Sequence, residues 1–136
     1  MSEIKKVAEG TNFTAVETGN IDDLQGKVFL KDVTGATAAE ISISLLAPGT
    51  EMPFFHTHKK NEETYIILSG EGDFQVDDKS FAIVSGSVVR VATRGKRSMR
   101  NTSAEPMRYI VIQARENSLE EYARADGEAA EQAKQW

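Results

Sequence analysis

Two histidines separated by a single residue are the side chains of this sequence best suited to hold a metal ion. His56 and His58 are the only histidines in the chain, and a carboxylate pair, Glu62 and Glu63, follows after a short polar turn. In an extended segment, residues i and i+2 project to the same face, so the two imidazoles point together. Imidazole and carboxylate ligands hold a divalent transition metal and leave positions open for chemistry. The spacing therefore predicts a metal site.

Other kinds of reactive site have little support in the sequence. The chain contains no cysteine, which excludes disulfides, thiolate metal ligands and cysteine nucleophiles. No serine lies in a nucleophile elbow, and with both histidines assigned to the metal no base remains for a catalytic triad. Phosphate-loop and dinucleotide-binding fingerprints are also missing from the sequence.

The sequence predicts that the elements which position these side chains are short strands. The clearest is residues 39–46, in which Ile41, Ile43 and Leu45 alternate with serines, the pattern of a half-buried strand. Further short apolar or extended segments lie between turns, many of them glycine-containing: 28–30, 52–58, 64–69, 73–76, 80–84, 88–91, 98–101 and 107–114. Many short strands in succession predict an all-β sandwich or barrel.

Only the tail of the chain has a helical pattern. Ser118 and Glu121 form a capping box, and Leu119, Tyr122 and Ala123 share one face of the helix that would follow. We therefore predict a C-terminal helix within residues 115–136.

Length and charge restrict the remaining possibilities. A chain of 136 residues, 40% hydrophobic and 27% charged, fits one globular domain. It has no signal-peptide core and no apolar run of membrane-spanning length, so we expect a cytoplasmic protein without a membrane partner. A net charge of −5 argues against broad nucleic-acid binding. Five cations between Arg90 and Arg100, with no acid among them, suggest either an anionic small ligand, a partner surface, or a solvated strand edge.

Gly49, the His56-Thr-His58 pair, Glu63 and Gly70 together resemble the first sequence motif of the cupins, with one extra residue between Gly49 and His56. Gly86 and Asn101 fall where the second cupin motif has its first glycine and its asparagine, and the resemblance covers about residues 38–114. The spacing to Gly70 favours Glu63 over Glu62 as the carboxylate ligand.

The second motif departs from the family pattern at three positions. Ala92, Arg94 and Arg97 stand where the family has proline, glycine and a metal-binding histidine. Arginine stays protonated and has no lone pair for a cation. The metal is then held by His56, His58 and Glu63 alone, or the site has lost it.

The resemblance implies a jelly-roll barrel of the double-stranded β-helix type. We expect N-terminal strands and an arm over residues 1–37, the barrel core over 38–114 and the C-terminal helix over 115–136. It also implies a homodimer, which would cover a sheet edge. The metal would be iron, manganese, zinc or nickel, which the sequence does not distinguish.

Several side chains are candidates for binding a substrate beside the metal. Arg97 would attract an anion, since a guanidinium binds a carboxylate or phosphate through two hydrogen bonds. The other candidates would together form the wall of a small-molecule cavity, although for each taken alone core packing is the better interpretation: Tyr65, Met99, Phe54 and Met52. Three functions stay open: a metal-dependent oxygenase, isomerase or decarboxylase acting on a small anionic molecule, a non-catalytic module that binds a sugar or organic acid, or a structural dimer with a vestigial pocket.

Overall fold

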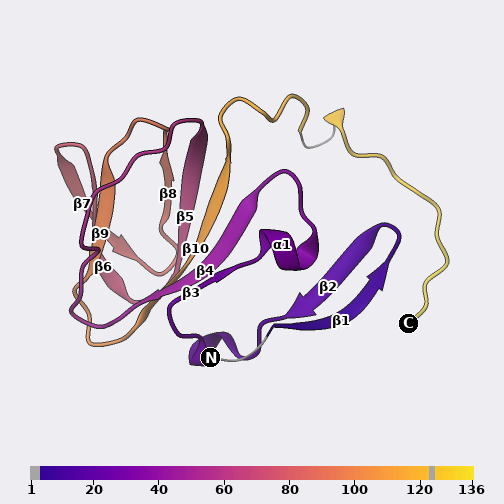
Figure 1. Cartoon of the computed structure of the whole chain (residues 1–136), viewed down its shortest axis with the longest axis horizontal. Coiled ribbons are helices and arrows are strands. Elements are labelled where there is room, and N and C mark those ends of the chain that lie inside the picture. The colour runs from indigo at the N-terminus through magenta and orange to yellow at the C-terminus, as the bar shows by residue number, and fades with distance from the viewer. Residues whose placement is uncertain (1–3, 123–124) are drawn as a thin grey trace.

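The fold is nearly all β, as expected from the sequence. A computed structural model describes residues 4–122 and 125–136. Its elements, coloured along the chain in Figure 1, are β1 (Lys5–Gly10), β2 (Phe13–Glu17), the short 3-10 helix η1 (Ile21–Asp23), β3 (Lys27–Phe29), α1 (Lys31–Thr34), β4 (Glu40–Leu46), β5 (Asn61–Ser69), β6 (Glu71–Val76), β7 (Lys79–Val84), β8 (Val88–Val91), β9 (Arg97–Asn101) and β10 (Met107–Arg115).

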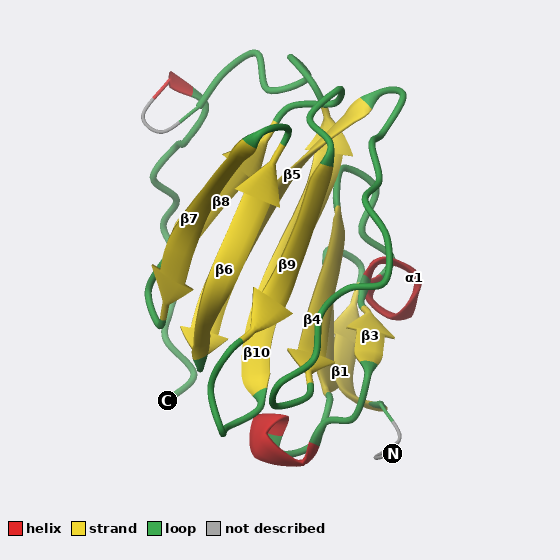
Figure 2. Cartoon of the chain, turned by 90° about the vertical axis from the view of Figure 1, so that its left-hand side faces the viewer, coloured by secondary structure: helices red, strands yellow, loops and turns green. Residues whose placement is uncertain are grey.

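Two antiparallel sheets face each other and form the barrel. One has five strands in the order β3-β4-β10-β5-β8, and the other has three in the order β7-β6-β9. Figure 2 shows β7, β6 and β9 in front of the larger sheet. The β1–β2 hairpin forms a separate sheet that lies beside the barrel in Figure 1. This arrangement fits the predicted jelly-roll fold.

The core lies between the two sheets. Its buried apolar side chains come from both sheets: Tyr65, Ile67, Phe74, Ile83, Val89, Val91, Met99, Met107, Tyr109 and Val111. Tyr65 packs edge-on against Phe74 with ring centroids 5.0 Å apart, which joins the large sheet to the small one. The barrel therefore has an ordinary apolar interior, into which the polar side chains of the site are inserted.

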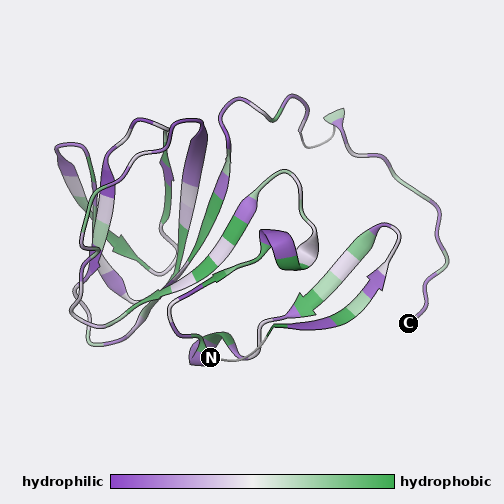
Figure 3. Ribbon diagram, in the orientation of Figure 1, coloured by the Kyte–Doolittle hydropathy of each residue, from purple (hydrophilic) through white to green (hydrophobic). Residues whose placement is uncertain are grey.

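Strand β4 coincides with the half-buried strand that the alternation predicted. Its buried face, however, carries the serines, and its more exposed face carries the isoleucines. Ser42 and Ser44 are 2% and 3% exposed, whereas Ile41 is 37% exposed. The register with β10 explains this, because Ser44 pairs with the inward-facing Tyr109. The alternation is visible along β4 in Figure 3. The isoleucines of β4 consequently lie on the outer face of the five-stranded sheet.

Asn101, the asparagine of the second motif, has a structural role. Its side chain is 2% exposed and donates to the carbonyl oxygens of Leu46 (3.0 Å) and Glu105 (2.7 Å). Its Oδ1 accepts from the backbone N–H of Ser103 at 2.9 Å. The amide therefore ties the loop after β9 to the end of β4, because both of its polar ends have internal partners.

The predicted C-terminal helix is not formed in the described part of residues 115–136. Strand β10 continues to Arg115, and the described residues after it are turns, a single 3-10 residue at Ala125 and chain without regular secondary structure. Leu119 and Tyr122 are exposed and have no surface to pack against, and Ala123 lies outside the described residues. A short helix draws most of its stability from packing of its apolar face, so propensity and a capping box do not suffice here. Across the described ranges, no helix is long and apolar enough to cross a membrane.

Candidate metal centre

The segment between β4 and β5 carries both histidines along the free edge of β9. The backbone N–H of Met52 donates to Met99 at 2.9 Å, and that of His58 donates to Thr93 at 2.9 Å. An isolated bridge joins His56 to Arg97. The segment therefore acts as an irregular fourth strand of the small sheet, and its alternation sends the two imidazoles to the same face.

The carboxylate comes from the opposite sheet. Glu63 lies on β5 in the same inward-facing row as Tyr65, and its side chain is almost fully buried. Glu62 points outward, where its Oε2 accepts from Arg90 Nε at 2.6 Å. The structure thus brings Glu63, and not Glu62, to the two histidines.

The three groups lie close enough to share one ion. His56 Nε2 is 3.3 Å from Glu63 Oε1, and His58 Nε2 is 3.2 Å from Glu63 Oε2. One ligand atom from each residue can be chosen so that all three lie within 4.8 Å of one another. Ligands at about 2.0–2.2 Å from a common ion lie roughly 3–3.5 Å apart, so the spacing suits a transition metal.

Two imidazole nitrogens of this group lack a partner. His56 Nδ1 and His58 Nε2 are buried and make no hydrogen bond to any described residue. For His58 Nε2 the neighbouring carboxylate oxygen is near but not aligned for a hydrogen bond. Buried polar atoms normally have partners, so a free nitrogen facing a carboxylate is what a metal would satisfy. The residues present fit a divalent metal.

The protonation states also suit metal binding. Burial lowers the pKa of His56 below its usual value, against the opposing pull of the Glu63 carboxylate. Burial alone raises the pKa of Glu63, but hydrogen bonds from Arg97 and Tyr65 help to bring it below its usual value. A neutral imidazole and an ionised carboxylate are the forms that bind a metal.

Tyr65 contacts the site through its hydroxyl group, which donates to Glu63 Oε1 at 2.8 Å. Burial and the Glu63 carboxylate both raise the pKa of Tyr65, so the phenol keeps its proton and remains a donor. Tyr65 therefore orients the carboxylate in this structure. Whether it also binds a substrate stays a prediction.

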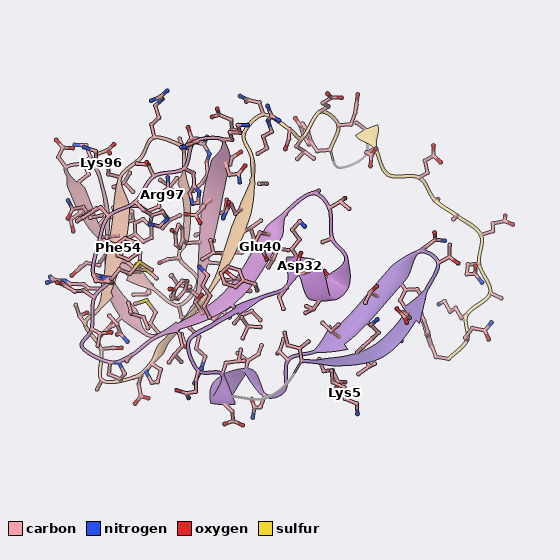
Figure 4. All side chains as sticks on the ribbon, in the orientation of Figure 1. Lys5, Asp32, Glu40, Phe54, Lys96 and Arg97 are labelled. Carbon is pink, nitrogen blue, oxygen red and sulfur yellow. The ribbon has the colours of Figure 1, made fainter. Side chains whose placement is uncertain are left out.

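Arg97 lies beneath the site instead of at its surface. Its side chain is 0% exposed, and its Nη1 donates to Glu63 Oε1 at 2.8 Å. Figure 4 shows Arg97 on the side of the barrel formed by the small sheet. Its remaining contacts are with backbone carbonyl oxygens of the loop before β9. Anion binding by Arg97 stays a prediction.

The three remaining candidates, Met52, Phe54 and Met99, are brought together. All line a cleft of about 410 Å³ that also includes residues of β6 and β9. Met99 is buried in the core, whereas Phe54 is 64% exposed and its ring lies edge-on to His56 with centroids 6.2 Å apart. The residues that line this cleft do not include the histidines or Glu63, so it lies beside the site.

The sequence did not predict that the loop of residues 92–95 accepts hydrogen bonds from Arg97. The contacts are made by backbone carbonyls, which carry no residue-type signal. Only Gly95 marked a turn there.

Comparison with known families agrees with this geometry. The model of the cupin domain matches residues 42–113, while no curated protein matches the chain. A solved cupin protein from Bacteroides fragilis shares 33% identity and has a TM-score of 0.75, covering 96% of this chain and 99% of its own.

Two further solved structures are similar over a shorter range. A candidate sugar phosphate isomerase from Acidithiobacillus ferrooxidans has 27% identity and a TM-score of 0.60, with 65% of this chain and 58% of that chain covered. A predicted oxalate decarboxylase from Thermotoga maritima has 25% identity and a TM-score of 0.59, with 65% and 78% covered. Together with the barrel topology and the family match over residues 42–113, the likeness to the Bacteroides protein establishes that the chain belongs to the cupin superfamily.

Proposed function

We propose that this cupin is a metal-dependent enzyme acting on a small anionic molecule. The observation that carries the proposal is the group of His56, His58 and Glu63, which gathers ligand atoms within 4.8 Å and leaves buried imidazole nitrogens free. When bound there, iron, manganese, zinc or nickel supplies a Lewis acid or redox centre with open positions. Oxygenation, isomerisation and decarboxylation are all compatible with such a centre.

The charges near His58 support an anionic substrate. The backbone of His58 is hydrogen-bonded to Thr93, which places the loop of residues 57–60 beside the loop of residues 92–96. These loops carry four exposed cations: Lys59, Lys60, Arg94 and Lys96. Clustered cations raise the local concentration of an anion and speed its arrival. Oxalate and sugar phosphates, named in the descriptions of two similar structures, are both anions.

The residues around the site have defined parts in this proposal. His56 and His58 hold the ion through neutral imidazoles, and Glu63 contributes its carboxylate. Tyr65 fixes the orientation of that carboxylate through a 2.8 Å hydrogen bond. Arg97 adds positive charge below the site, which favours an anion above it.

Two alternatives each have an observation in their favour. The ion pair of Arg97 with Glu63 gives the carboxylate a cation without any metal, as a vestigial pocket would have. The cleft beside Phe54 and Met52 can hold a sugar or organic acid without catalysis.

Elemental analysis of protein purified without a histidine tag separates these functions. About one equivalent of a transition metal per chain is expected, together with turnover of one or more members of a panel of small carboxylates and sugar phosphates, assayed with and without air. Metal without turnover would favour the binding module. Absence of metal, with no uptake on addition of zinc, iron(II), manganese or nickel, would refute the metal-dependent enzyme.

We also propose that two copies of the chain pair through the outer face of the five-stranded sheet. Ile43, Ile110, Ile66 and Val88 are register partners in four adjacent strands and form an apolar row. Val88 is 63% exposed. A contiguous apolar patch of this kind is typical of an interaction surface.

Val88→Glu is expected to convert the dimer into a monomer of 14.9 kDa in sedimentation or light-scattering measurements. A buried unpaired carboxylate is costly at an interface but not on a free surface. Val84→Glu, at a 51% exposed valine on β7 of the other sheet, is the control and should leave the mass at twice that value. A wild-type protein that is monomeric at all concentrations would refute the pairing.

A further inference from the structure

Glu63 and Arg97 form a buried ion pair in the middle of the candidate metal centre. Their side chains are 5% and 0% exposed, and Nη1 of the arginine is 2.8 Å from Oε1 of the glutamate. A buried carboxylate without a partner charge is strongly unfavourable. The arginine thus already supplies the positive charge that a metal would bring.

The arginine is held so that it cannot easily leave. Its Nε donates to the carbonyl oxygen of Gly95 at 3.1 Å, and its Nη2 donates to those of Ala92 at 2.8 Å and Gly95 at 2.9 Å. Nη2 also lies 3.3 Å from the carbonyl oxygen of Thr93. A guanidinium presents its donors in a rigid planar fork, so several carbonyls together fix its position.

The two oxygens of Glu63 have different surroundings. Oε1 accepts from Arg97 and from Tyr65, both at 2.8 Å, and lies 3.3 Å from His56 Nε2. Oε2 lies 3.2 Å from His58 Nε2, and that nitrogen has no hydrogen bond to a described residue. One oxygen is fully engaged, and the other is available beside a free nitrogen.

We propose that Arg97 is a built-in counter-ion of Glu63, which keeps the carboxylate charged and oriented without a metal and leaves only Oε2 as a metal ligand. The part of this inference that concerns metal rests on the proposed function. The site would then stay folded when the metal is absent. It would bind a metal less tightly than a site without the arginine, since two cations repel each other.

Thermal unfolding in EDTA tests the counter-ion role without any metal. Arg97→Met should lower Tm by about 10 °C, because it leaves Glu63 buried and unpaired. The double variant Arg97→Met/Glu63→Gln should recover at least half of that loss, since it removes the stranded charge as well. Arg100→Met is the matched control. It breaks an exposed pair with Asp73 and should lower Tm by no more than about 2 °C.

Two results would overturn the counter-ion role: an Arg97→Met protein as stable as wild type, or a double variant no more stable than the single one. If Arg97→Met does not fold, Arg97→Lys replaces it, because lysine keeps the positive charge. Arg97→Lys should then fold in EDTA. Its failure to fold would show that the shape of the arginine matters, and not its charge.

Calorimetric titration with zinc tests the part that concerns metal. Arg97→Met should bind zinc about tenfold more tightly than wild type, and zinc should raise its Tm by more than that of wild type. Equal zinc affinity in both proteins would refute the claim that Arg97 weakens metal binding. Binding to neither protein would refute the proposed metal function, and the counter-ion role would still be decided by the EDTA experiment.

Discussion

His58→Ala is expected to weaken zinc binding by about 100-fold or more. Three protein ligands are the smallest set usual for a zinc site that keeps an open position, and this change leaves two. His58 Nε2 is also the buried nitrogen that faces the less engaged oxygen of Glu63, so no neighbouring group replaces it. The dissociation constant is measured by calorimetry, or by competition with a chelator, at one fixed pH near neutral.

Thr57→Ala is the matched control for this prediction. Thr57 lies between the two histidines, is exposed, and projects from the opposite side of the extended segment. Its removal should leave the zinc affinity within about twofold of wild type, because no candidate ligand moves. Similar losses in His58→Ala and Thr57→Ala would mean that the segment, and not the imidazole, governs binding. Unchanged affinity in His58→Ala would place the metal elsewhere.

The grouping of the two histidines, as candidate metal ligands, could be predicted from the sequence because the signal is local. The i, i+2 spacing of His56 and His58 fixes their common face in any extended segment. The alternation of β5 does not distinguish Glu62 from Glu63, because this strand is apolar on both faces, and the preference for Glu63 comes from its spacing to Gly70. In the structure, pairing with β8 opposes Glu63 to the inward-facing Val91 and so directs its side chain inward.

The strand positions were predictable, but which face of β4 is buried was not. Alternation of isoleucine and serine identifies a strand, whereas the direction of each face is set by the register with β10. The wrongly predicted C-terminal helix has a related cause. Its propensity and capping signals are local, but its stability depends on a surface to pack against, and Leu119 has none in the described structure.

The contacts of Arg97 could not be predicted from the sequence. Its charge and its place in the motif were evident, and they pointed to an anionic ligand. The structure directs the guanidinium inward to Glu63 and to loop carbonyls. Every residue has a backbone carbonyl, so the sequence does not show which carbonyls will accept hydrogen bonds from an arginine. It therefore does not distinguish an arginine bonded inside the protein from one that binds a ligand.

Gly72→Ala is expected to cost about 3 kcal/mol or more in the free energy of unfolding, a large share of the 5–15 kcal/mol typical of a domain. A Cβ at this position would lie 1.9 Å from the carbonyl oxygen of Arg100 and 2.9 Å from Met107 Cε. The methionine can move, but the carbonyl belongs to the backbone of β9, which is paired directly with β6. Relief therefore requires the two strands to separate, which also disturbs the neighbouring Asn101 and the loop that it holds.

Gly26→Ala is the control that measures the backbone effect of replacing a glycine without a steric clash. Gly26 has a φ of +71° and nothing within 4 Å of its added Cβ, so only the left-handed backbone is penalised, at about 1 kcal/mol. Urea unfolding of the two variants should therefore differ by about 2 kcal/mol, with Gly72→Ala the less stable. Equal losses would mean that β6 and β9 can move apart at little cost. The small sheet would then be too compliant to hold the histidine segment at a fixed distance from Glu63.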